Sequence, residues 1–194
     1  MNTAGWYGLL MMTGWGDESG SRPDKDPGTY IMATAMCDDT DLAEIRAAMS
    51  EEILTGESKV HWHGSSDNRR LALCHRVATL PLAGIAVVHN QLDATDRRHR
   101  RKCLETMLPL VDDYGCASIT LESRGGQDGS DLDLLQKFRA QKLVTTSLRL
   151  HHSVGRDEPA LWVADIICGA ITQSRIGNPE YFDVISSTVE VTVL

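Results

Sequence analysis

The chain has 194 residues, a length that suits a single domain with one hydrophobic core. Its hydrophobic content of 42% and charged content of 24% are ordinary for a soluble globular protein. The formal net charge of −8 argues against a general nucleic-acid coating protein, which would usually carry a basic face and a high pI, but not against an enzyme whose metal-binding carboxylates add to the negative count.

The first predicted elements are two strands, over 7–16 and 29–37, joined by a loop rich in Gly, Pro and Asp. We expect them to form an antiparallel hairpin, with the acidic motif Asp17-Glu18-Ser19-Gly20 at its turn. A helix is predicted next, from an N-cap at Asp41 to about Leu54.

The rest of the chain alternates between predicted strands and helices, which indicates one α/β domain with a mixed central sheet. Further strands are expected over 59–63, 82–89, 116–122 and 145–152, and further helices over 66–80, 95–114, 130–142 and 159–173. The tail 178–194, rich in Val, Thr and Ile, is a candidate for an added strand. No internal repeat or linker is found, so a single domain is expected over 1–194, with its core at about 7–175.

The five cysteines are scattered and include no C-x-x-C pair, which is typical of reduced thiols and not of a disulfide framework or a zinc site. No apolar run approaches about 18 residues, and no basic segment precedes an apolar one at the N-terminus. We therefore expect a cytoplasmic protein that does not span a membrane.

Three carboxylates lie in apolar settings, where an ionised side chain is costly unless a charge or a hydrogen bond compensates it. Asp17 follows a predicted buried strand, Glu122 ends another, and Asp165 is the only charge in the apolar segment 160–171. Together they are best explained as ligands that converge on divalent metal. Taken singly, Asp17 and Glu122 are also compatible with polar strand ends, and Asp165 with a buried side chain bonded to a hydroxyl or an amide.

Strand geometry sends the side chains of Asp17 and Glu18 to opposite faces, so only one of them can point into a shared pocket. Asp17 has the parity of Trp15 and is favoured as the inward ligand. The flexible turn after Glu122 is placed to deliver Arg124 or Asp128 to the same site. Asp131 and Asp133 are predicted to be capping and first-turn charges of the following helix.

Two further groups of residues favour an ordinary surface interpretation. His61 and His63 would share one face of a strand, but without Cys or a third patterned His a zinc site is not supported. The basic run 97–102 spreads over several faces of a helix, so a solvated face is favoured over a phosphate-contacting patch. The usual nucleotide-binding and hydrolase motifs are absent.

With these residues in view, the chain resembles the bacterial family called domain of unknown function 3800, and in particular its actinobacterial members. The matching segments occur in the family's order between residues 15 and 170. Three of them are typical of the family: Gly16–Gly20, Leu121–Arg124 with Asp128, and Leu161–Asp165. Two more, Lys59–Trp62 and Arg97–Leu104, resemble the actinobacterial members. The resemblance implies a ribonuclease H-like α/β fold, with a mixed central sheet of about five strands flanked by helices.

The resemblance also implies that Asp17, Glu122 and Asp165 converge on two Mg²⁺ or Mn²⁺ ions, with Asp128 as an additional catalytic candidate. Members of this superfamily typically cleave phosphodiesters, so we expect a nuclease or phosphodiesterase that acts on nucleic acid. The expected substrate contacts are Glu18, Ser19, Lys59, His61 and Arg124. The alternatives are a non-catalytic ribonuclease H-like interaction module, linked to mobile elements or phage defence, and a hydrolase of small phosphate esters.

Overall fold

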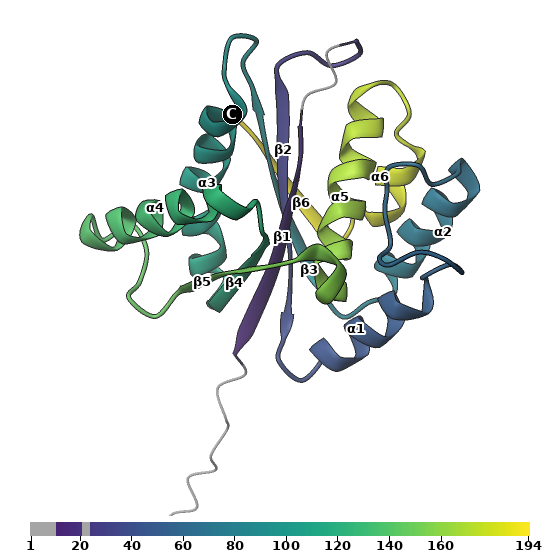
Figure 1. The fold of residues 1–194 in the computed structure, drawn as a ribbon, viewed down its shortest axis with the longest axis horizontal. Helices are drawn as coiled ribbons and strands as arrows, with labels where there is room; N and C mark the ends of the chain where they lie inside the picture. Colours follow the sequence, from purple (N-terminus) through teal and green to yellow (C-terminus); the bar gives the residue numbers. More distant parts are fainter. Residues whose placement is uncertain (1–10, 21–23) are drawn as a thin grey trace, which may run out of the picture.

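A computed structural model describes residues 11–20 and 24–194 of the protein. The described residues form a mixed sheet of order β5-β4-β1-β2-β3-β6, with helices on both of its faces (Figure 1). The strands are β1 (Met12–Ser19), β2 (Thr29–Asp38), β3 (Ala83–Asn90), β4 (Cys116–Glu122), β5 (Arg149–Ser153) and β6 (Val189–Val193).

Strand β1 lies in the interior of the sheet, antiparallel to β2 and parallel to β4. The β2–β3 pair is antiparallel, and the β3–β6 and β4–β5 pairs are parallel. In the β1–β4 register Gly16 lies beside Leu121, so the next residues, Asp17 and Glu122, are neighbours at the same edge of the sheet. The carboxyl ends of parallel strands are where ligands bind in open α/β sheets.

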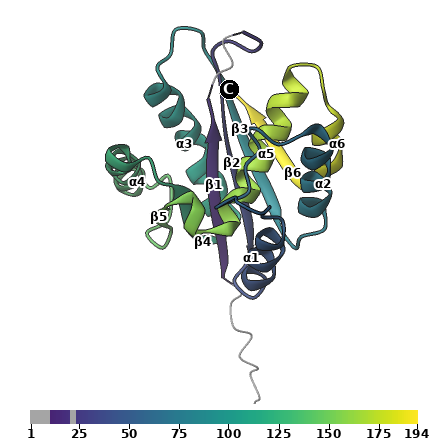
Figure 2. The ribbon, with the colours of Figure 1, turned by 45° about the vertical axis from the view of Figure 1, so that its right-hand side comes forward.

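The helices are divided between the two faces of the sheet, as the view in Figure 2 makes clear. One face is covered by α1 (Leu42–Glu51), α2 (Asp67–Ala78), α5 (Pro159–Arg175) and α6 (Glu180–Ile185). The other is covered by α3 (Asp96–Asp113) and α4 (Asp128–Ala140). Two short 3-10 helices, η1 (Gly125–Gln127) and η2 (Gly155–Asp157), precede α4 and α5. None of the helices in the described ranges has the length and hydropathy to cross a bilayer.

Each face of the sheet has its own hydrophobic core, because successive strand residues point to opposite sides. On β2, Ile31 and Ala33 pack in the core under α5, whereas Tyr30 and Met32 pack in the core under α3. Helix α5 is apolar on nearly every side and is largely buried, as the sequence predicts. All five cysteines are buried and free, which confirms that they form no disulfide framework.

Several predicted elements differ from those observed. Residues 59–63 form no strand: Val60 and Trp62 enter the core from an irregular segment between α1 and α2, which pairs with no strand in the described residues. Asp41 occupies the N-cap position of α1 but makes no side-chain capping bond. The tail folds first as α6 and then as β6, so the added strand is confirmed and the described sheet has six strands, not about five.

The acidic motif lies inside β1 and not at the hairpin turn, because the strand continues through Ser19. The antiparallel pairing of β1 with β2 is confirmed. Residues 7–10 of the first predicted strand lie outside the described residues.

Candidate active site

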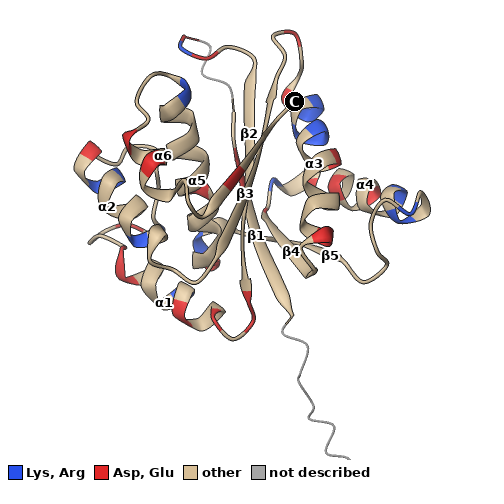
Figure 3. Cartoon of the chain, turned by 180° about the vertical axis from the view of Figure 1, so that it is seen from behind, with Lys and Arg blue, Asp and Glu red and all other residues tan. Residues whose placement is uncertain are grey.

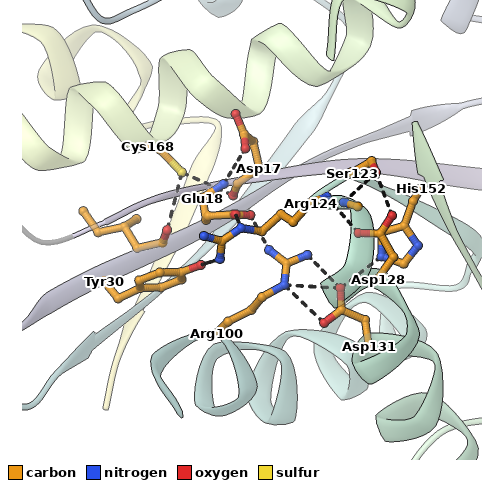
Figure 4. Close-up of polar contacts among 12 residues, drawn as sticks. Asp17, Glu18, Tyr30, Arg100, Ser123, Arg124, Asp128, Asp131, His152 and Cys168 are labelled. Carbon is orange, nitrogen blue, oxygen red and sulfur yellow. Dashed lines mark hydrogen bonds and ion pairs between the residues drawn. The ribbon is translucent and has the colours of Figure 1, made fainter. Parts of the chain in front are cut away.

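Asp17 lies near the end of β1, and its side chain points to the face of the sheet that α5 covers. It is 9% exposed, and its Oδ1 accepts a hydrogen bond from the backbone N–H of Glu18 at 2.8 Å. Among the described residues this amide is the one hydrogen-bond donor to its carboxylate. The Sγ of Cys168, on α5, lies 3.5 Å from the backbone oxygen of Asp17 and confirms that the strand end faces this helix (Figure 4).

Glu122 and Asp165 bring two more carboxylates to the same region from β4 and α5. The Nζ of Lys59 donates to Oε1 of Glu122 at 2.8 Å, forming a half-buried ion pair. The backbone N–H of Trp62 donates to Oδ2 of Asp165 at 2.9 Å. The irregular segment 59–63 therefore supplies a partner to each of these two carboxylates.

The pKa of Asp17 shows that the three carboxylates interact. It is raised from 3.8 to about 8, mainly by burial and then by the charges of Glu122, Asp165 and Glu18, against the opposing hydrogen bond from the Glu18 amide. Burial also raises the pKa of Asp165, although the Trp62 amide and the charges of Lys59 and His61 oppose this shift. Negative charge at Asp17 is thus poorly compensated, which is the environment that a bound cation would stabilise.

The donor set at this edge suits a hard divalent cation, because carboxylate oxygens are the ligands that Mg²⁺ and Mn²⁺ prefer. In the described parts of the chain, however, no three His, Cys, Asp or Glu side chains are grouped closely enough to hold a metal ion as they stand. Lys59 draws Glu122 toward itself and Trp62 holds Asp165, so each carboxylate has a separate partner. The chemistry of these residues fits the ion, and Lys59 and the Trp62 amide each engage one oxygen of a carboxylate.

Gly155, in η2, lies directly against Glu122 and Lys59, a role that the sequence did not reveal. A Cβ at this position would overlap the carboxylate of Glu122 and come within 2.8 Å of the Nζ of Lys59. Its carbonyl accepts a hydrogen bond from the indole N–H of Trp162, on α5, at 2.6 Å. The close approach of backbone to carboxylate therefore requires glycine here. No turn motif around residue 155 signals this, because the crowding comes from β4 and from residue 59.

On the opposite face of β1, Glu18 enters a buried charge network (Figure 4). It forms ion pairs with Arg100 of α3 and, at 3.1 Å, with Arg124. Arg100 also pairs with Asp131 of α4 at 2.7 Å. Arg100 and Asp131 are each 4% exposed, so the prediction of a solvated face is wrong for Arg100. Asp131 lies in the first turn of α4, as predicted, but it is buried. Both had the sequence signature of exposed helix residues, and only their mutual pairing allows burial.

The remaining predicted site residues lie around the carboxylates or apart from them. Asp128 accepts hydrogen bonds from the Ser123 hydroxyl at 2.6 Å and the Arg124 amide at 2.7 Å, which anchors the start of α4. The Ser19 hydroxyl meets that of Thr172 at 3.4 Å. His61 is exposed on the loop beside Asp165. The structure thus groups Asp17, Glu122, Asp165 and Lys59, and it engages Glu18, Arg124 and Asp128 in other contacts.

Comparison with known proteins gives a match in structure but not in sequence. No family model and no curated protein matches the chain. A chain of the PCNA:RNase HII complex from Archaeoglobus fulgidus superposes with a TM-score of 0.57 at 15% identity, over 91% of this chain and 88% of that chain. Ribonuclease H2 from Pyrococcus horikoshii superposes with a TM-score of 0.49 at 13% identity, over 86% of this chain and 74% of that one. Taken with its mixed sheet and flanking helices, the chain has a ribonuclease H-like fold.

Proposed function

We propose that the protein is a metal-dependent nuclease or phosphodiesterase of the domain of unknown function 3800 family, with Asp17, Glu122 and Asp165 as its metal ligands. The observation that carries this proposal is the buried carboxylate of Asp17, whose pKa is raised by burial and by the charges of the other two. These residues come from β1, β4 and α5; Asp17 and Glu122 lie at the carboxyl ends of neighbouring parallel strands, and the charge of Asp165 is near enough to raise the pKa of Asp17. The ribonuclease H-like fold supports the same reading.

Two Mg²⁺ or Mn²⁺ ions at such a site would supply an activated water and stabilise the leaving oxygen of a phosphodiester. Lys59 pairs with Glu122, and if a cation took the place of its ammonium there, that ammonium would be available to bind a substrate phosphate. His61, exposed beside Asp165, is the second proposed phosphate contact. Glu18 and Arg124, which are paired with each other, position the end of β1 against the turn after β4.

The first prediction concerns cleavage. Asp17→Asn should lower the rate of Mn²⁺-dependent cleavage of labelled DNA or RNA by at least about a hundredfold, because it removes a charged ligand from the centre of the site. The matched control is Asp113→Asn, at the exposed end of α3, which should leave the rate unchanged. The proposal is wrong if the purified protein cuts neither polymer with Mn²⁺ or Mg²⁺, or if the Asp17 variant cuts as fast as the wild type.

A non-catalytic ribonuclease H-like module is the second candidate function. It is favoured by the ion pair of Lys59 with Glu122 and by the hydrogen bond from the Trp62 backbone N–H to Asp165, because these contacts give two of the three carboxylates a partner without metal. Calorimetric titration with Mn²⁺ separates the two candidates. Binding that is lost in Asp165→Asn supports the enzyme, whereas heats equal to those of dilution, for the wild type and the variant alike, support the module.

A further inference from the structure

A basic groove lies between α3 and α4, on the face of the sheet opposite to Asp17. A cavity of about 400 Å³ is lined there by Arg97, Arg100, Arg101, Ser130, Asp131 and Lys137, together with apolar side chains at its base. A second hollow adjoins it along α3, shares Arg97 and Arg101 with it, and adds Arg98 and Lys102. We call these two hollows together the α3–α4 groove.

The cations of the α3–α4 groove are poorly compensated. In the described ranges of the chain no ion pair engages the side chains of Arg97, Arg98 or Lys137. Arg101 and Lys102 share a single carboxylate, that of Glu105, at 3.0 and 2.8 Å. Asp131 is already engaged by Arg100 and His152, so the exposed Asp133 is the one other acidic side chain in the lining. The chain as a whole has a net charge of −8, yet Lys and Arg residues gather on the first turns of α3 (Figure 3).

This arrangement costs helix stability. Arg97 and Arg101 are four residues apart, as are Arg98 and Lys102, and like charges at this spacing repel each other on a helix surface. A polyanion that lies across both pairs would attract all four cations and so offset their mutual repulsion. The groove therefore has the charge pattern of a surface built for an anionic partner.

We propose that the α3–α4 groove binds the phosphate backbone of a nucleic acid strand. Its lining contains three cations that form no ion pair within the described residues and no aromatic side chain, so it suits phosphate contacts without base stacking. Arg100 lies at the base of the groove and is ion-paired with Glu18, the residue after Asp17, so a bound strand lies one side chain away from β1. The inference deepens the proposed function, on which it rests for the choice of nucleic acid as substrate.

The test measures binding without catalysis. The variant Arg97→Gln/Arg98→Gln/Lys137→Gln removes three cations that make no ion pair with any residue of 11–20 or 24–194, so its circular dichroism should match that of the wild type. Fluorescence anisotropy of a labelled oligonucleotide in EDTA, over a series of salt concentrations, gives the slope of log K against log salt. Each phosphate contact contributes about 0.7–0.9 to this slope, so the triple variant should lower it by about 2–3 and bind about tenfold or more weakly at low salt. The control Arg76→Gln, on α2 beyond the other face of the sheet, should leave the slope unchanged.

An unchanged slope and affinity in the triple variant would overturn the proposal. So would binding of the wild type to anionic phosphatidylserine vesicles with no binding to either DNA or RNA, because the groove would then serve a membrane surface. Failure of the nuclease proposal gives a different result: binding that depends on the three cations, but no cleavage with Mn²⁺. Conversely, if the triple variant cleaves with wild-type KM and salt dependence, the groove is ruled out as a nucleic acid binding site and the nuclease proposal stands.

Discussion

At the scale of single residues, Asp17 combines deep burial with a negative charge that is poorly compensated. Its carboxylate is almost fully enclosed, has one hydrogen-bond donor in the described residues, and experiences the negative charges of Glu122, Asp165 and Glu18. Lys59 compensates Glu122 directly and Asp165 at longer range, whereas burial and the three neighbouring carboxylates dominate the pKa of Asp17. Without a cation, this residue should therefore hold a proton near neutral pH.

The raised pKa of Asp17 predicts how the stability of the metal-free protein depends on pH. Between 3.8 and about 8, the folded state binds a proton at Asp17 that the unfolded state has released, so the free energy of unfolding should fall as the pH rises through this window. Each unit of pKa difference corresponds to about 1.4 kcal/mol, so the loss should amount to a few kcal/mol. Urea unfolding in EDTA at pH 5 and pH 8 measures it.

Asp17→Asn should remove most of this fall and make the protein more stable than the wild type at pH 8, since asparagine carries no charge to bury. Asp113→Asn, at an exposed position, should keep the wild-type profile. Identical pH profiles for the wild type and the Asp17 variant would show that the pKa of Asp17 is not raised, and the candidate site would lose its electrostatic basis.

At the scale of elements, the packing of α5 against the 59–63 segment positions Asp165. Gly169, one turn after Asp165, allows the ring of Trp62 to lie directly on the helix, since a Cβ there would overlap the indole. The same ring meets Tyr181 of α6 edge-on, with ring centroids 5.4 Å apart. This contact holds the backbone N–H of Trp62 against the Asp165 carboxylate.

Gly169→Ala should therefore displace Trp62 and destabilise the protein by about 1–3 kcal/mol, the usual cost of overpacking a core. It should also weaken Mn²⁺ binding, because Asp165 loses the amide that orients it. The matched control is Gly129→Ala on α4, where an added Cβ meets nothing within 4 Å; it should stabilise by about 0.5–1 kcal/mol through helix propensity. Urea unfolding and calorimetry measure both effects, and equal stability of the two variants would refute this account of Trp62.

At the scale of the whole molecule, one guanidinium connects elements that are far apart in the chain. Arg100 of α3 binds Glu18 of β1 and Asp131 of α4, and Asp131 also meets Nε2 of His152 on β5 at 3.0 Å. Burial lowers the pKa of Arg100, but its contacts with Asp131 and Glu18 outweigh burial and keep the guanidinium charged. These contacts fix α3 and α4 against the sheet and form the base of the α3–α4 groove.

Replacing Arg100 should be costly, because the buried Asp131 loses its guanidinium partner and Glu18 keeps only Arg124. Arg100→Met should lower the free energy of unfolding by about 3–5 kcal/mol, the range measured when one partner of a buried pair is removed. The matched variant Arg101→Met breaks an exposed pair with Glu105 and should cost about 1 kcal/mol or less. Urea unfolding at pH 7 compares the two, and a loss of similar size in both would show that the buried network contributes no more than a surface pair.

The amino-acid sequence by itself determined what depends on local patterns. Hydrophobic periodicity predicted β2, β4 and α3 almost to the residue, and strand parity assigned Asp17 and Glu18 to opposite faces. The apolar surroundings of Asp165 indicated a buried acid on a buried helix. These inferences succeed because side-chain direction in a strand or helix is set by the backbone period, which neighbouring residues reveal.

The tertiary structure alone decided what depends on contacts between distant segments. The burial of Arg100 rests on Asp131, the position of Glu122 rests on Lys59 and Gly155, and the 59–63 segment is irregular because it packs on α5 and pairs with no described strand. Each of these residues has an ordinary local sequence. A charge is buried or exposed according to the partner that the fold brings to it, and no pattern within one element contains that information.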